Sequence, residues 1–199
     1  AMVGIFLDQR EIRNTLRQHY SKNKNILNTF SYTGAFSVAS ALGGAKKTSS
    51  VDLAKRSLVK TKEQFAINNI NLDKQNIIIE DVFNYFKYAI RKKLLFDVVI
   101  VDPPSFARSK KITFSVAKDY TKLLKEVIQI TNKGGIIVAS TNYANLDASQ
   151  FRYFIYKAFD QLKCKYKIEK MYSLPPDFRI SSTFLEGDYL KVAFIRKIK

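Results

Sequence analysis

The chain of 199 residues contains one cysteine, Cys164, and one histidine, His19. A lone cysteine excludes an internal disulfide and a cysteine-rich metal site, so we expect a cytoplasmic protein without a metal. His19 lies in a charged N-terminal segment, away from the motifs described below, and receives no catalytic role. The sequence has no apolar run long enough to span a membrane and no basic segment with a clean apolar face, which argues against a membrane partner.

Glycine is also scarce where many nucleotide-binding folds require it. The segment Ser31-Tyr32-Thr33-Gly34-Ala35-Phe36 contains one glycine, so the G-x-G-x-x-G turn that binds a pyrophosphate is absent. A P-loop is absent as well. These absences argue against a nicotinamide-dependent dehydrogenase and a P-loop nucleotide hydrolase.

Acidic residues are few compared with basic ones. Seventeen Asp and Glu oppose 34 Lys and Arg, which gives a formal net charge of +17. Such a surface attracts polyanions, and nucleic-acid phosphates are the commonest target. With 46% hydrophobic and 26% charged residues, the composition is that of one ordinary globular domain.

Apolar runs alternate regularly with segments of helical period. We predict strands at residues 26–30, 47–51, 76–79, 96–101, 136–140, 166–172 and 189–195. We predict helices at residues 35–42, 53–69, 82–92, 116–131 and 147–162. This order predicts a doubly wound α/β fold with a mostly parallel seven-stranded sheet and an antiparallel last strand.

The domain is expected to cover residues 25–199, and residues 1–24 form an N-terminal extension or the end of a linker. Residues 7–20 in this extension are predicted to be helical and to lie outside the sheet. Because Ala1 precedes Met2, we expect the natural chain to begin further upstream. The sequence leaves open whether the protein forms a homodimer.

Three acidic residues end three successive predicted strands: Asp52, Asp81 and Asp102. Ligands of open parallel sheets bind at the carboxyl ends of the strands, so we expect these carboxylates to share one site. The first can accept the hydroxyls of a ribose, the second an adenine amine, and the third an ammonium group or a reacting base. A nucleoside that carries an amino acid and no phosphate suits this set. Each acid taken alone could instead be a helix N-cap or a surface charge.

The motif Asp102-Pro103-Pro104-Ser105-Phe106 follows the most apolar predicted strand. Its two prolines stop the strand and fix the chain, which would hold Asp102 at the edge of the site. Phe106 offers a flat face on which an extruded base could stack. We therefore predict Asp102, Pro103, Pro104 and Phe106 as the catalytic residues, although a rigid turn with Phe106 in the core would explain the motif structurally.

Several motifs together resemble the large-subunit (23S) ribosomal RNA methyltransferases of the RlmI/RlmK type. They are Phe6-Leu7-Asp8-Gln9-Arg10, residues 28–37, Gly43-Gly44-Ala45, Val51-Asp52 and the Asp102 to Phe106 motif. The resemblance implies a Rossmann-like class I methyltransferase that uses S-adenosyl-L-methionine, and it covers nearly the whole chain from Gly4 on. Many members of that family carry an N-terminal RNA-binding PUA domain, which this sequence lacks. The cofactor residues implied by position are Gln9, Arg10, Ser31, Tyr32, Thr33, Gly34, Ala35, Asp52, Leu53, Asp81, Val82 and Asp102.

The expected reaction is methylation of an RNA base, with guanine N7 favoured. Methylation of C5 in cytosine needs a thiolate nucleophile, and members of the resembled family that make 5-methylcytosine keep a cysteine after the fifth strand. Here residues 139–145 contain no cysteine, and Cys164 lies further on, where we interpret it as structural. Guanine N7 is already nucleophilic and needs only orientation, and Asn142 and Asn145 loosely match the members that make 7-methylguanosine.

Other functions stay open on the sequence. They include 5-methylcytosine formation, methylation of an exocyclic base amine, and methylation of a small molecule or protein. A non-catalytic RNA-binding module on a methyltransferase fold is the alternative of another class. The basic run after Phe106, with Arg108, Lys110 and Lys111, is predicted to contact RNA phosphates at the mouth of the base pocket, although most such runs are solvated surface.

Overall fold

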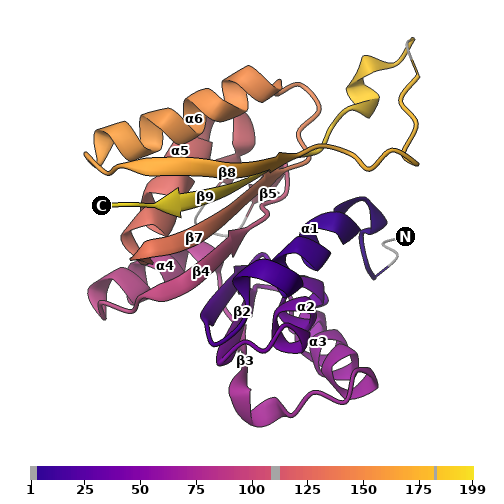
Figure 1. Ribbon diagram of the computed structural model, residues 1–199, viewed down its shortest axis with the longest axis vertical. Coiled ribbons are helices and arrows are strands. Elements are labelled where there is room, and N and C mark those ends of the chain that lie inside the picture. Colours follow the sequence, from indigo (N-terminus) through magenta and orange to yellow (C-terminus); the bar gives the residue numbers. More distant parts are fainter. Residues whose placement is uncertain (1–3, 109–112, 182) are drawn as a thin grey trace.

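The structure is a computed structural model that describes residues 4–108, 113–181 and 183–199 (Figure 1). Its centre is a seven-stranded sheet in the order β3-β2-β1-β4-β7-β9-β8. The strands are β1 (Asn25–Thr29), β2 (Lys47–Asp52), β3 (Gln75–Ile79), β4 (Phe96–Val101), β7 (Thr131–Thr141), β8 (Tyr166–Tyr172) and β9 (Lys191–Lys197). All the neighbours from β3 to β7 pair in parallel, and β9 is antiparallel to both β7 and β8. The predicted fold class is confirmed.

Helices connect the strands in the predicted order. They are α1 (Arg10–Thr15), α2 (Ala35–Leu42), α3 (Lys55–Ile67), α4 (Val82–Arg91), α5 (Val116–Gln129) and α6 (Ala148–Gln161). Short helical turns are η1 (Leu7–Gln9), η2 (Leu16–Tyr20), η3 (Leu72–Lys74) and η4 (Leu185–Gly187). A two-stranded antiparallel ribbon of β5 (Phe106–Arg108) and β6 (Thr113–Ser115) was not predicted from the sequence. Strands of three residues are too short to produce a recognisable period.

The central strands are apolar on both faces because helices cover both sides of the sheet. In β4, Val98 and Ile100 join one hydrophobic cluster, whereas Val99 and Val101 join the other. Successive side chains of a strand point to opposite faces, so the two clusters are the two faces of the sheet. The helices α4, α5 and α6 pack on one face, and α1, η2 and α2 pack on the other (Figure 1). This two-sided burial explains the nearly continuous apolar sequence of β4.

The N-terminal segment lies outside the sheet, as expected, but it also completes the core on one face. Ile12 and Leu16 have no solvent-exposed surface and pack with Ile26, Phe36 and Ile100. Their spacing of four residues places both side chains on the same side of the helical segment. Residues 7–20 therefore stabilise the domain. They also form part of its surface near the carboxyl ends of the parallel strands.

The strand order fixes the place where a ligand can bind. From β1 the chain runs outward through β2 to β3, and it then returns to β4 on the other side of β1. The carboxyl ends of β1 and β4 therefore flank the topological switch point of the sheet, where such folds leave a crevice. In the described part of the chain, no helix is long and apolar enough to cross a membrane.

We expect Leu16→Ala to lower the free energy of unfolding by about 2–4 kcal/mol, because it leaves a cavity in a fully buried position. Chemical denaturation of the apo protein would measure the change. Leu7→Ala is the matched control, since Leu7 is 60% exposed in the same segment and should change stability by less than about 0.5 kcal/mol. Equal stability of the two variants would contradict the role given to the N-terminal segment.

Candidate functional site

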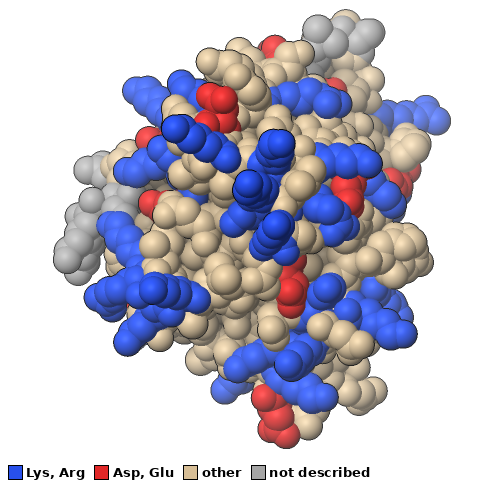
Figure 2. All heavy atoms as spheres, turned by 60° about the vertical axis from the view of Figure 1, so that its left-hand side comes forward, with Lys and Arg blue, Asp and Glu red and all other residues tan. Residues whose placement is uncertain are grey.

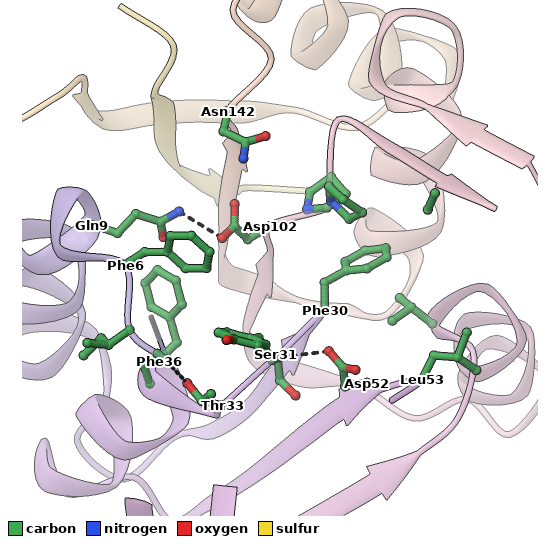
Figure 3. A pocket seen from close by; sticks show the side chains of 18 of the residues that line it. Phe6, Gln9, Phe30, Ser31, Thr33, Phe36, Asp52, Leu53, Asp102 and Asn142 are labelled. Atoms are coloured by element: carbon green, nitrogen blue, oxygen red, sulfur yellow. Dashed lines mark hydrogen bonds between the residues drawn. The ribbon is translucent and has the colours of Figure 1, made fainter. Parts of the chain in front are cut away.

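A cavity of about 440 Å³ opens at the switch point, where the loops after β1, β2, β3 and β4 meet. Its size falls within the range of pockets that bind small molecules. Figure 3 shows the side chains that surround it. They come from those four loops, from the N-terminal segment and from the loop after β7.

The loop between β1 and α2 has an unusual backbone. Phe30, Tyr32 and Gly34 have φ angles of 53°, 49° and 78°, all in the left-handed region. This conformation costs of order 1 kcal/mol at each non-glycine residue, so it persists only where the surroundings impose it. Glycine is needed at position 34 for a second reason, since a Cβ there would approach Cγ2 of Thr61 to 2.5 Å.

Asp52, at the end of β2, holds this loop in place. One carboxylate oxygen accepts a hydrogen bond from the backbone N–H of Tyr32 at 2.9 Å. The other accepts from the N–H of Ala54 at 2.9 Å and from the Ser57 hydroxyl at 3.0 Å. The carboxylate thus joins the loop after β1 to the start of α3 and still lines the cavity. Its remaining lone pairs can accept hydroxyl groups of a ligand.

Asp81, after β3, is both a helix cap and a wall of the cavity. Its Oδ1 accepts from the N–H groups of Phe83 at 2.9 Å and Asn84 at 3.2 Å, which caps α4. In the described part of the chain, its Oδ2 has no hydrogen-bond partner. The helix-cap interpretation of this residue and a ligand-binding role are therefore compatible, since they use different oxygens.

Asp102, after β4, pairs with the N-terminal segment. Its Oδ2 accepts a hydrogen bond from Nε2 of Gln9 at 2.9 Å. Gln9 is buried, and its Oε1 is without a partner in the described part of the chain. A buried carbonyl of this kind requires a donor, and a ligand in the cavity is in position to supply one.

Burial raises the pKa of the Asp102 carboxyl above its usual range, and the nearby Asp8 acts in the same direction. The Gln9 amide opposes this shift by donating to the carboxylate, and the nearby Ser140 hydroxyl also acts to lower the pKa. Desolvation prevails because the carboxyl group is largely surrounded by protein atoms. A cationic ligand group beside Asp102 would relieve this cost.

Helical spacing decides which basic residue of the N-terminal segment faces the cavity. Gln9 and Arg13 are four residues apart and both line it, whereas Arg10 does not. Arg10 points elsewhere, forming an ion pair with Asp177 and lying over the Phe178 ring. Arg13, which the sequence analysis did not single out, donates to the carbonyl of Phe6 at 2.7 Å. The period of the helix could have identified it.

Aromatic side chains make the rest of the wall. Phe30 and Phe83 meet edge to face with ring centroids 6.1 Å apart, and Phe83 lies 5.5 Å from Phe114. On the other side, Phe6 lies 5.8 Å from Tyr32. Phe114 comes from β6, and no signal in the sequence marks it as a site residue. Such flat apolar surfaces suit the two faces of a purine ring.

The ribbon of β5 and β6 closes one side of the cavity. Ala107 and Phe114 are opposite each other in the ribbon and both line the cavity. Phe106 precedes Ala107 and therefore points to the other face of the ribbon, where it is 60% exposed. Stacking of Phe106 on an extruded base stays a prediction, since its ring is not part of the wall.

Most of the predicted site residues lie together around the cavity. Those that line it are Gln9, Ser31, Tyr32, Thr33, Ala35, Asp52, Leu53, Asp81, Val82, Asp102, Pro103 and Pro104. Gly34 is in the loop beneath them, and Arg108 ends β5. Lys110 and Lys111 lie outside the described residues. Lining residues that were not predicted include Ile5, Phe6, Arg13, Phe30, Phe36, Phe83 and Phe114, whereas Asn142, which the resemblance singled out, also lines the cavity.

Comparison with known protein families identifies the chain. Residues 1–181 match the model of a family described as S-adenosylmethionine-dependent methyltransferase. The chain belongs to this family. The predicted cofactor and class of enzyme are thereby confirmed.

Two curated relatives of the methyltransferase illustrate its similarity to other proteins. YwbD of Bacillus subtilis (strain 168), named as a proposed ribosomal RNA large subunit methyltransferase, is 56% identical over 197 residues. That match covers 99% of this chain and 50% of YwbD. Ribosomal RNA large subunit methyltransferase K/L of Shewanella sediminis (strain HAW-EB3) is 40% identical over 141 residues, 70% of this chain and 19% of that protein. The chain thus spans half or less of these relatives.

Solved structures agree with the fold of the methyltransferase. SMU.776, a proposed methyltransferase crystallised in complex with SAH, superposes with a TM-score of 0.93 at 47% identity. The match covers 98% of this chain and 51% of SMU.776. A methyltransferase from Agrobacterium tumefaciens, at 18% identity and a TM-score of 0.77, shares the fold.

The side chains around the cavity fit S-adenosylmethionine. We propose that the buried Oε1 of Gln9 and the carboxylate of Asp102 accept hydrogen bonds from the ammonium of the methionine part. We propose that Asp52 accepts the ribose hydroxyls and that Oδ2 of Asp81 accepts the adenine amine. Arg13, the one cation among the described lining residues, would suit the methionine carboxylate. The lining acids would repel a phosphate.

We expect Asp102→Asn to stabilise the apo protein and weaken the binding of S-adenosylhomocysteine about 10- to 100-fold, through loss of a charge-assisted pair. Stability should rise because the ionised carboxyl is desolvated in the folded state. Because the pKa of this carboxyl is higher in the folded state than its ordinary value near 4, the carboxyl lowers the stability of the parent once the pH rises above about 4. The difference in stability between parent and variant should therefore vanish as the pH falls towards 4. Thermal unfolding at several pH values and calorimetric titration would measure both effects. A destabilised variant that binds like the parent would contradict this account of Asp102.

Proposed function

We propose that this methyltransferase modifies a base of large-subunit ribosomal RNA, with N7 of guanine as the favoured acceptor. The names of the relatives YwbD and methyltransferase K/L support an RNA substrate, and the net charge of +17 suits a polyanion. When bound, the cofactor supplies an electrophilic methyl group. The task of the protein is then to hold the acceptor atom of the base against that group.

The residues at the cavity favour an acceptor that needs no covalent or general-base help. Its described lining contains no cysteine, histidine or lysine. Cys164 follows α6, at the ends of the strands that lie away from the cavity. It packs against the hydrophobic core, and its thiol faces the carbonyl of Leu162. A thiolate cannot reach from there to C6 of a cytosine in the cavity. Guanine N7 carries an exposed lone pair and requires only orientation.

Asn142 is the single observation that most favours guanine. It lines the cavity in the loop after β7, and its Oδ1 accepts a hydrogen bond from the Ser105 hydroxyl at 2.9 Å. Figure 3 shows its amide nitrogen directed towards Asp102 and the cavity. The N–H groups can donate to O6, which lies beside N7 on guanine, whereas adenine presents an amine donor at that position.

Methylation of an exocyclic amine is the second candidate, and Asp102 is the observation that favours it. This carboxylate adjoins Pro103 and Pro104 at the cavity and could accept a hydrogen bond from an amine. The assignment of Asp102 to the cofactor ammonium competes with that role. We therefore rank the amine below guanine N7.

We expect 7-methylguanosine in unmodified 23S ribosomal RNA after incubation with the protein and S-adenosylmethionine, as measured by mass spectrometry of the nucleosides. Asn142→Ala should lower kcat/KM for RNA roughly three- to tenfold through loss of one hydrogen bond, with unchanged affinity for S-adenosylhomocysteine. Cys164→Ser is the matched control and should keep the parental rate. Appearance of 5-methylcytidine, or a covalent adduct with RNA that contains 5-fluorocytidine, would overturn the guanine assignment.

A further inference from the structure

The positive charge of the protein is concentrated on the side of the sheet opposite the cofactor cavity. We call this side the amino edge. It consists of the segments at the amino ends of the parallel strands, together with the carboxyl end of β9. These segments are residues 21–24, 43–47, 69–74, 91–95, 131–135, 162–167 and 197–199. These segments contain fourteen Lys and Arg and one acidic residue, Asp73. The described lining of the cofactor cavity, by contrast, contains three Asp and one Arg.

The cations of the amino edge are accessible. Lys197 donates to two backbone carbonyls, and the side chains of the other thirteen belong to exposed residues. Figure 2 brings forward the side where the C-terminus lies and shows Lys and Arg spread over it, with Asp and Glu sparse. Several helices also end at this edge, and a cation near each helix end would complement the helix dipole. Fourteen cations far exceed that need.

The charges follow the edge of the sheet in a row. Lys46 precedes β2 and Lys47 begins it, Lys24 precedes β1, and Lys133 lies near the start of β7. The loops that carry Lys24 and Lys46 are joined by a backbone hydrogen bond of 2.9 Å. Across seven strands spaced about 4.8 Å apart, the row is about 29 Å long. A row of this kind matches the repeated phosphates of a nucleic-acid backbone.

A hollow of about 150 Å³ lies within the row. Lys24, Lys133 and Arg196 are among the residues that line it, together with His19 and Asp97. Asp97 is already engaged, because its carboxylate accepts hydrogen bonds from the N–H of Asn25 and from Asn132. Arg196 is paired with Glu169. In the described part of the chain, Lys24 and Lys133 have no carboxylate partner, so both remain available to an anion.

We infer that the amino edge is a second RNA-binding surface, which contacts phosphates remote from the nucleotide to be methylated. The inference rests on the proposed RNA substrate. The strands β1, β2 and β4, with lengths of five or six residues, separate this edge from the cofactor cavity by about 17 to 20 Å. The two surfaces lie at opposite ends of the strands, so the RNA that suits them best is a folded one that places separate elements on the two sides of the domain.

The test replaces Lys24, Lys46, Lys133 and Lys165 together with Gln. Binding to unmodified 23S ribosomal RNA is measured over a range of salt concentrations. Each lost phosphate contact lowers the slope of log affinity against log salt by about 0.7 to 0.9. We expect the slope to fall by about 2 to 4 and the affinity at low salt to fall at least tenfold.

The matched control replaces Lys62, Lys87, Lys118 and Lys157, four exposed lysines of helices outside the amino edge, with Gln. It removes the same charge and should lower the slope by less than 1. Both variants should bind S-adenosylhomocysteine like the parent. If the parent binds RNA and the two variants weaken it equally, the second surface is disproved while the proposed function stands. If the parent itself binds no RNA, the proposed function fails and the inference with it.

Discussion

The carboxylate of Asp52 is the interaction on which the site depends. It accepts hydrogen bonds from the backbone of Tyr32 and Ala54 and from the side chain of Ser57, so it ties the end of β2 to the loop after β1 and to α3. That loop holds its left-handed backbone at Phe30 and Tyr32 only because such contacts fix it. The part of the cavity wall formed by Ser31, Tyr32, Thr33 and Ala35 is therefore fixed by contacts within the protein.

Strand ends and helix spacing explain how much of this site the sequence could predict. The alternation of apolar runs predicted every strand of the main sheet, because burial on both faces gives the central strands a strong apolar pattern. The predicted bounds of α2 also agree with the structure to the residue. Parallel strands bring Asp52, Asp81 and Asp102 to one edge whatever the details of packing. The wall residue Phe114 could not be predicted from the pattern of apolar runs. It belongs to a three-residue strand whose pairing depends on tertiary contacts. Arg13 was not predicted, because the sequence motif at residues 6–10 does not include it and only the spacing of four residues from Gln9 places it at the cavity.

The two edges of the sheet have opposite electrostatic character, and each suits one of the two ligands that we propose. The lining of the cavity is acidic, which suits a cofactor with an ammonium group and two hydroxyls but would repel the phosphates of an RNA. The amino edge is strongly basic and lies at the far ends of the same strands. We propose that this separation of charges allows one small domain to bind a cationic cofactor and a polyanionic RNA together.

Calorimetric titration of Asp52→Asn with S-adenosylhomocysteine tests whether carboxylates at the strand ends hold the cofactor. Asp73→Asn, a change of an exposed acid at the amino edge, is the matched control. We predict that Asp52→Asn binds about 10- to 100-fold more weakly than the parent, because charge-assisted hydrogen bonds are lost, while Asp73→Asn binds like the parent. Unchanged affinity in a folded Asp52→Asn variant would contradict the account.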